Sequence, residues 1–98
     1  MTELEIFEQI TGVKFTPEFL KCQKKENIDL RDIFVWLTLD IFKKSDYERV
    51  AKLIGKDRTS IYGSIIRFYN RHFTDKNYRE IANKINNEFI ELTLKQKL

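Results

Sequence analysis

The chain has 98 residues, near the common size of one domain, so we expect residues 1–98 to form a single domain with no room for a separate ATPase or nuclease domain. Hydrophobic residues make up 42% of the chain, enough for one core, and the formal net charge is +3. The single cysteine, Cys22, excludes an internal disulfide and a cysteine zinc cluster, and the longest apolar run, Ile33–Leu37, is far too short to span a bilayer.

Two helix starts are predicted near the N-terminus. Thr2-Glu3-Leu4-Glu5 fits a capping box, and Gly12 can end the helix that begins there. Thr16-Pro17-Glu18 combines an N-cap, a proline at the first helical position and an acid in the first turn. We therefore expect a second, short helix from Pro17 to Cys22.

The central part of the chain should hold the most buried helix. Gln23–Ile28 is interpreted as a polar loop, and Asp29 as the N-cap of the next helix. From Leu30 to Phe42 apolar residues cover almost the whole circumference, which is typical of a helix buried on all sides. The length of this segment and its lack of alternation favour helix over strand. Trp36 is accordingly expected to be a core residue rather than a platform for a nucleobase.

Residues 43–71 fit a helix-turn-helix. Ser45-Asp46-Tyr47-Glu48 is a second capping box that can begin one helix, and Gly55 can end it. A second helix is expected to begin after Lys56-Asp57 and to run from Arg58 to Arg71. Two short helices joined by a glycine-containing turn, the second with a polar face, form the arrangement that places side chains in a DNA major groove.

The apolar residues of these segments recur at helical spacing. In the first helix of the pair they are Tyr47, Val50, Ala51 and Ile54. In the second helix one stripe consists of Ile61, Ile65, Phe68 and His72. A second row, which is mostly polar, consists of Thr59, Gly63, Ile66 and Asn70. Thr74 or Asp75 can cap a last helix, whose apolar face would carry Tyr78, Ile81, Ile85, Phe89 and Leu92. The sequence thus predicts six helices and no strand, an all-α fold.

Positive charge is concentrated in the helix-turn-helix segment. Residues 43–71 contain eight basic and three acidic residues, a balance of +5, which leaves −2 for the rest of the chain. Such an asymmetry suits a phosphate-binding face, although a solvated helix surface could also carry it.

Three segments resemble the C-terminal DNA-binding domain of DnaA, the bacterial replication initiator. Gly55-Lys56-Asp57-Arg58-Thr59-Ser60-Ile61 resembles the G-[RK]-D-H-[ST]-[ST]-[VI] motif of that family. Leu30-Arg31-Asp32-Ile33-Phe34-Val35-Trp36-Leu37 is similar to its P-R-Q-I-A-M-Y-L helix, and Val50-Ala51-Lys52-Leu53-Ile54-Gly55 to its I-G-x-x-F-G element. The resemblance covers roughly residues 4–92 and is dense from Leu30 to Arg67.

This resemblance implies a six-helix, Trp-repressor-like domain that binds short duplex sites, with the helix that starts at the motif in the major groove. Lys24 and Lys25 would lie in the family's basic loop, and Arg31 matches an arginine before its central helix. Together with polar residues at both ends of the helix-turn-helix, the expected DNA-binding residues are Lys24, Lys25, Arg31, Lys43, Lys44, Ser45, Lys56, Asp57, Arg58, Thr59, Ser60, Tyr62, Gly63 and Arg67.

Three residues depart from the family pattern. Arg58 and Gly63 stand where the family has histidines, and Asp29 stands about where its basic loop presents an arginine to the minor groove. An acid at that position would be repelled by phosphates and cannot donate to A·T edges. These departures argue against recognition of the initiator's usual box but leave duplex binding open.

Several of the expected contact residues also have a purely structural interpretation. Asp57 can be an N-cap instead of a base reader, and Thr59 and Ser60 can satisfy free backbone N–H groups. Tyr62 can stack or contact phosphate, or lie against the preceding helix. Gly63 can permit close approach either to DNA or to a neighbouring helix.

Signs of catalysis are missing from the sequence. His72 has no cysteine or carboxylate at ligand spacing, and there is no glycine-rich phosphate loop and no Ser/His/Asp set. We therefore expect a cytoplasmic, nucleoid-associated, non-enzymatic protein without cofactor, metal or membrane contact.

The leading hypothesis is sequence-selective binding of double-stranded DNA. The alternative is a repurposed copy of the fold that binds protein partners, such as replication proteins, with little DNA affinity. A third hypothesis is dimerisation through the last helix, since Ile81, Ile85, Phe89, Leu92 and Leu94 exceed what one core face needs. The sequence does not give the oligomeric state.

Overall fold

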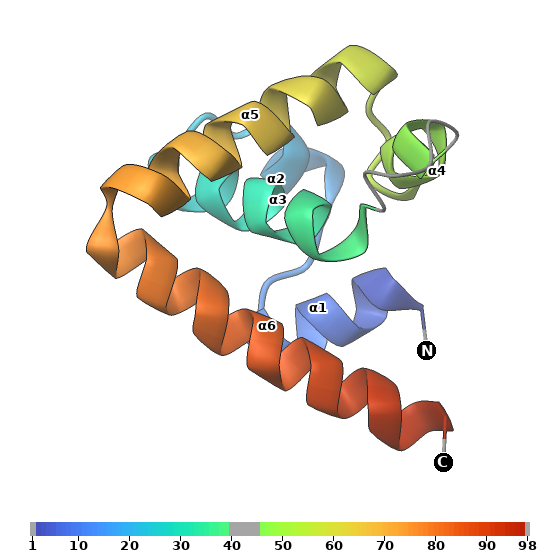
Figure 1. The fold of residues 1–98 in the computed structure, drawn as a ribbon. Helices are drawn as coiled ribbons and strands as arrows, with labels where there is room; N and C mark the ends of the chain where they lie inside the picture. Colours follow the sequence, from blue (N-terminus) through green and yellow to red (C-terminus); the bar gives the residue numbers. More distant parts are fainter. Residues whose placement is uncertain (1, 40–45, 98) are drawn as a thin grey trace.

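The chain folds into a bundle of helices, and the computed structural model describes residues 2–39 and 46–97 (Figure 1). Within those residues six helices and no strand are present, so the predicted all-α class is confirmed. The helices are α1 (Glu3–Thr11), α2 (Pro17–Lys21), α3 (Lys25–Thr38), α4 (Asp46–Leu53), α5 (Arg58–Thr74) and α6 (Lys76–Lys97).

The predicted starts of α1 and α2 are confirmed. Thr2 Oγ1 accepts from the Glu5 backbone N–H at 3.2 Å, and Glu5 Oε1 accepts from the Thr2 backbone N–H at 3.1 Å, which completes the capping box. Gly12 ends α1 in the left-handed region with φ 72°. Thr16 caps α2, with Pro17 at its first position.

The predicted start of α3 is wrong. This helix begins at Lys25, with Lys24 as an N-cap that makes no side-chain hydrogen bond, so most of the expected loop at residues 23–28 is helical. Asp29 is not an N-cap but lies inside α3, where its carboxylate accepts from Arg71 Nη1 at 2.7 Å. At its other end α3 stops at Thr38, short of the expected residue 42.

The core forms around α3, which lies between α5 on one side and α1 with α6 on the other (Figure 1). Phe7 and Phe34 are fully buried, with ring centroids 5.2 Å apart. Trp36 stacks on the buried Phe68 with 4.3 Å between ring centroids, so it contributes to the core as expected. However, α3 is not buried on all sides, since Trp36 and Leu37 are only half-buried.

The last helix packs through most of the predicted residues, with Ile81 as the exception. Asp75 caps it by accepting from the Tyr78 backbone N–H at 3.1 Å, as expected. Its buried residues are Tyr78, Ala82, Ile85 and Phe89. Ile81 was expected in this face but is 54% exposed, whereas the neighbouring Ala82 is fully buried.

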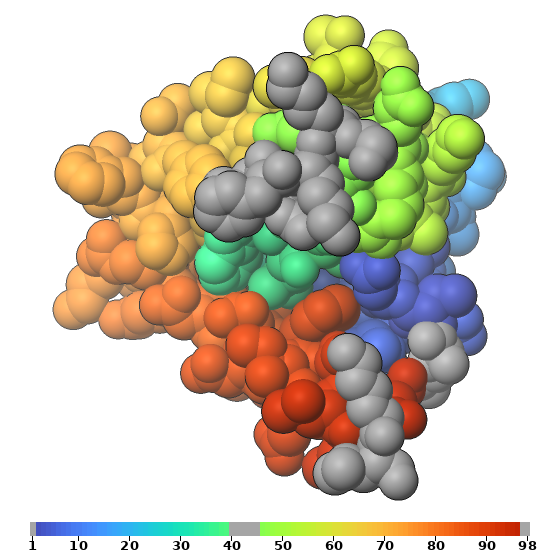
Figure 2. Space-filling view, turned by 45° about the vertical axis from the view of Figure 1, so that its right-hand side comes forward, coloured from blue at the N-terminus to red at the C-terminus, as the bar shows by residue number. Residues whose placement is uncertain are grey.

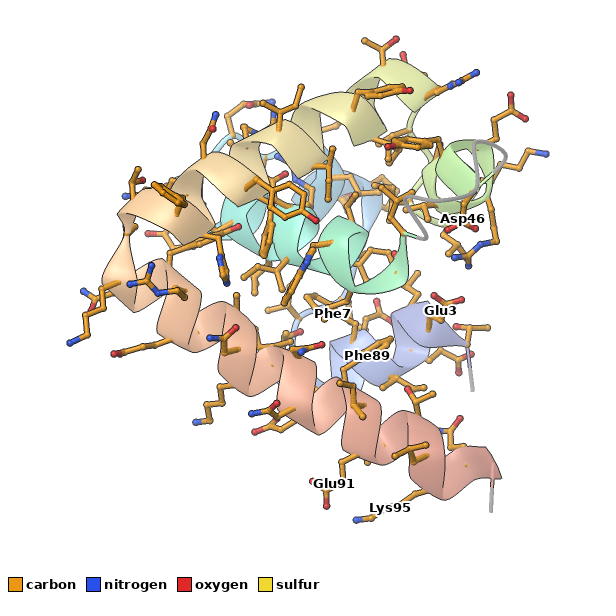
Figure 3. The ribbon with its side chains drawn as sticks, viewed as in Figure 1. Glu3, Phe7, Asp46, Phe89, Glu91 and Lys95 are labelled. Atoms are coloured by element: carbon orange, nitrogen blue, oxygen red, sulfur yellow. The ribbon has the colours of Figure 1, made fainter. Side chains whose placement is uncertain are left out.

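Electrostatic contacts tie α4 to the N-terminal helix, whereas α6 carries surface charges. Arg49 Nη1 donates to Glu3 Oε1 at 2.7 Å and Arg49 Nε to Asp46 Oδ1 at 2.5 Å, and Figure 3 shows Glu3 and Asp46 near each other. Glu91 and Lys95 form a pair on the outer side of α6, pointing away from the domain. Figure 2 shows α4 and the start of α5 in the upper part of the surface and α6 in the lower part, with α3 and α1 between them.

Candidate nucleic-acid interface

The connection between α4 and α5 forms a tight turn around one glycine. Gly55 has φ 63°, a left-handed conformation that favours glycine, and Lys56 N donates to Ala51 O at 2.9 Å. Asp57 then caps α5 by accepting from the Ser60 backbone N–H at 2.8 Å, a bond that lowers the pKa of the Asp57 carboxyl. The structural interpretation of Asp57 as an N-cap is therefore confirmed.

Apolar packing holds the two helices of this pair together. Val50 and Ala51 of α4 are buried, as are Ile54 in the turn and Ile61 and Ile65 of α5. All of them belong to the stripes that the sequence predicted. The pair therefore has the expected arrangement of two helices that pack across a turn.

The outward side of α5 is uncovered at its N-terminal end. Arg58, Thr59 and Ser60 are exposed, and the row that continues along the helix includes exposed Ile66 and Asn70. The C-terminal helix does not cover this surface, since α6 lies on the far side of α3 (Figure 1). Residues expected to meet DNA at the start of α5 are thus accessible.

Tyr62 lies against the preceding helix, one of its two expected placements. Its ring stacks on the Tyr47 ring with 4.5 Å between centroids and an interplanar angle of 17°. The Arg58 guanidinium lies 6.0 Å from the Tyr62 ring centroid, at the limit of a cation–π contact. The Tyr62 ring is therefore braced by α4 and also supports Arg58.

Arg67 forms a salt bridge with a carboxylate of α3. Its Nε and Nη2 atoms donate to the two carboxylate oxygens of Asp32 at 3.0 and 3.1 Å, and Nη2 also donates to Ser64 Oγ at 3.3 Å. Burial raises the pKa of the Asp32 carboxyl, and the Arg67 guanidinium opposes that rise. A Cβ atom at Gly63 would lie 3.3 Å from Arg67 Nη1, so the absent side chain leaves room for this guanidinium rather than for a neighbouring helix.

The expected exposure of Arg31 to DNA is corrected by the structure. Arg31 is only 9% exposed, and its guanidinium donates to the backbone carbonyls of Leu20 and Cys22. It therefore fastens the end of α2 and the following loop to α3. Lys24 and Lys25, which follow that loop, are exposed.

The negative charge of Asp29, which departs from the family pattern, is paired with an arginine within the fold. Arg71 binds Asp29 at 2.7 Å and Asp75 at 3.2 Å, and its guanidinium lies 4.4 Å from the Tyr78 ring centroid. One guanidinium thus connects α3, α5 and the start of α6. The repulsion that the sequence suggested between Asp29 and phosphate is reduced by this pairing.

A cationic hollow of about 300 Å³ separates the loop before α3 from the start of α5. Its lining contains three cations and no carboxylate, and consists of Gln23, Ile28, Arg31, Ile54, Lys56, Ser60, Ser64 and Arg67. Lys56 in this lining, and the exposed Lys24, Lys25 and Arg58, form no ion pair with any residue in ranges 2–39 and 46–97. Lys43, Lys44 and Ser45, also expected to bind DNA, lie outside the described residues.

His72 is a packing residue. Its ring lies 5.2 Å from the Phe68 ring and 5.9 Å from the Trp36 ring, centroid to centroid. Within residues 2–39 and 46–97, no group of three or more His, Cys, Asp or Glu residues could hold a metal ion. None of the helices in the same ranges combines the length and apolarity needed to cross a bilayer.

Comparison with known proteins gives no family for this chain. No protein-family model matches it, and no curated protein or solved structure does so. The arguments about function therefore rest on the residues and their geometry.

Proposed function

We propose that this chain is a Trp-repressor-like domain that binds double-stranded DNA sequence-selectively, with α5 in the major groove. The observation that carries the proposal is the start of α5: an exposed, polar helix end where Lys56 and Arg58 have no ion pair in the described part of the chain, next to a hollow lined by three cations. An α-helix fits the major groove, and the N-terminal residues of a recognition helix meet the base edges.

Each group at the start of α5 has a chemically suitable partner on DNA. The Arg58 guanidinium can donate in bidentate fashion to guanine O6 and N7 or to a phosphate. The hydroxyls of Thr59 and Ser60 can donate to phosphate, and the Thr59 methyl group can contact a thymine methyl. Lys56 lines the adjoining hollow, and Lys25 lines a second hollow beside α5 together with Arg67 and Arg71, so a phosphate strand beside α5 would pass these cations. Such binding would associate the protein with the nucleoid, and the DnaA resemblance suggests a role in replication.

Selection of bound duplexes from a random pool, followed by titration of the enriched duplex, tests the proposal. We expect one enriched motif and an affinity that falls steeply with salt. Absence of binding to every duplex at about 50 mM salt would refute the proposal.

A repurposed domain that binds replication or mobile-element proteins is the second candidate. Two observations favour it: Gly63 offers no side chain to a base edge, and the Arg67 guanidinium is already bound to Asp32. Capture of defined replication proteins from a nuclease-treated extract, together with failure of the duplex selection, would support this candidate instead.

A further inference from the structure

A line of exposed apolar side chains runs along α5 beside its polar row. Its members are Tyr62, Ile66, Tyr69 and Phe73, with exposed fractions of 43%, 58%, 48% and 84%. Their spacing of four, three and four residues keeps them on one side of the helix, as in the seam through which two helices pack. We call these four residues the α5 stripe.

The exposed apolar residues of α6 do not form such a line. Ile81 lies on a different side of α6 from Ile90 and Leu94, since Ile81 and Ile90 are nine positions, or two and a half turns, apart. Ile85 and Phe89, which the sequence suggested for a dimer face on this helix, are buried in the core of the domain. An interface with another helix is therefore better supported on α5 than on α6.

The α5 stripe borders the surface proposed to meet DNA. Thr59, Gly63 and Asn70 lie about 70° around the helix axis from the centre of the stripe, at 3.6 residues per turn, and Arg58 lies about 50° from it on the other side. Ile66 lies at the border of the two surfaces. A partner on the stripe would therefore compete with DNA for α5, and it requires an explanation of its own.

We propose that a second copy of this chain covers the α5 stripe, with the two α5 helices antiparallel across a two-fold axis. The stripe has no charged member, so two copies can approach without burying unpaired charge. In the antiparallel register Tyr62 faces the partner's Phe73, and Ile66 faces the partner's Tyr69. Both contacts pair large apolar side chains.

Charge favours the antiparallel orientation over the parallel one. Arg58 lies at the N-terminal end of the stripe, one turn before Tyr62, and no basic residue precedes Phe73 on the same side of the C-terminal half. Parallel helices would bring the two Arg58 guanidinium groups together, whereas antiparallel helices place them at opposite ends. In the antiparallel orientation the positive end of each helix dipole also lies beside the negative end of the other, which is favourable.

The area of the stripe sets the strength of the dimer. A buried aromatic side chain contributes roughly 150–250 Å². With the observed exposed fractions, the four side chains offer on the order of 450 Å² per copy, or about 900 Å² per dimer. Stable interfaces bury about 1,200–2,000 Å², so the dimer belongs to the weak, reversible class.

Sedimentation of the complete chain without DNA, from about 10 µM to about 1 mM, tests the proposal. The weight-average mass should rise above the monomer mass of 11.9 kDa as concentration increases. Phe73→Ser should weaken association on the order of tenfold or more, whereas Leu94→Ser, a similar change at a 57% exposed residue of α6, should associate like the unmodified chain. Circular dichroism checks that both variants keep their helix content.

A chain that stays monomeric throughout this range, or a Phe73→Ser variant that dimerises like the unmodified chain, overturns the proposal. Orientation is tested in a Cys22→Ser background. Tyr62→Cys mixed with Phe73→Cys should form a disulfide faster than either variant alone. Equal or faster cross-linking of Tyr62→Cys with itself overturns the antiparallel arrangement. Because no DNA is present, these results do not depend on whether the chain binds duplexes.

Discussion

Replacing Lys56 and Arg58 together by alanine should reduce both the affinity for duplex DNA and its dependence on salt. Both side chains lie at the start of α5, and neither forms an ion pair with a residue that the structure describes. Their charges are therefore available to neutralise phosphates, and their loss breaks no bridge in the described part of the fold. Arg67 and Arg71 are unsuitable for this test because they hold Asp32 and Asp29.

The magnitude follows from the number of available cations. If Lys24, Lys25, Lys56 and Arg58 each neutralise one phosphate, the slope of log affinity against log salt is about −3.6, since each contact contributes about −0.9. Raising salt from about 50 to about 200 mM then lowers affinity roughly 150-fold. With the double substitution the slope is about −1.8, and the same change in salt lowers affinity roughly 12-fold.

Fluorescence anisotropy with a labelled duplex at several salt concentrations measures both slopes. Lys84→Ala is the matched control, because Lys84 is an exposed lysine on α6 away from the start of α5. An unchanged slope in the double variant, or an equal change in the control, would show that these two cations do not contact phosphate. Circular dichroism distinguishes this result from loss of fold.

Further outcomes are expected for the fold itself. Arg67→Ala leaves the buried Asp32 carboxylate without its guanidinium, so urea denaturation should show a loss of about 1–3 kcal/mol near neutral pH. Burial raises the pKa of Asp32 in the folded state, so the folded protein binds a proton on this carboxylate more tightly than the unfolded chain does. The loss of stability in Arg67→Ala should therefore shrink as pH falls from neutral towards about 4. A loss independent of pH would contradict the argument. Phe34→Ala removes a fully buried ring and should cost about 3–5 kcal/mol in the same assay. Gly55→Ala adds a Cβ that meets no atom within 4 Å, so thermal unfolding should show only the backbone cost of φ 63°, about 1–2 kcal/mol. The hydrogen bond to Ser60 lowers the pKa of Asp57, so the ionised cap stabilises the first turn of α5 at pH values above the unfolded-state pKa. Protection of the amides at the start of α5 against exchange, relative to their intrinsic rates, should therefore fall as pH drops below about 4, and unchanged protection would argue against the cap.

Local signals in the sequence predicted most helix ends well. Thr2, Thr16, Asp57 and Asp75 each accept a backbone N–H at a helix start, because capping involves only residues a few positions apart. The buried stripes of α4 and α5 were predictable for the same reason. They depend on helical spacing alone.

The errors came from contacts between residues distant in sequence. Aspartate is a frequent N-cap residue, but the Asp29 carboxylate instead binds Arg71, 42 positions away. The helix α3 begins earlier, at Lys25, without a side-chain cap. Arg31 was expected at the surface, yet carbonyls at the end of α2 bind its guanidinium. The bond between Asp32 and Arg67, 35 positions apart, likewise has no local signal. Pairings of this kind depend on how helices pack.

The support of α5 comes mainly from Ile61, Ile65, Phe68 and the bridges made by Arg67 and Arg71. Thr59 and Asn70 on the outer side take no part in that support beyond the continuity of the helix. Substitutions there should therefore change what the helix touches without changing whether the domain folds. A scaffold with this separation can acquire new preferences for its target through single surface changes, and libraries randomised at such positions should yield folded members in high proportion.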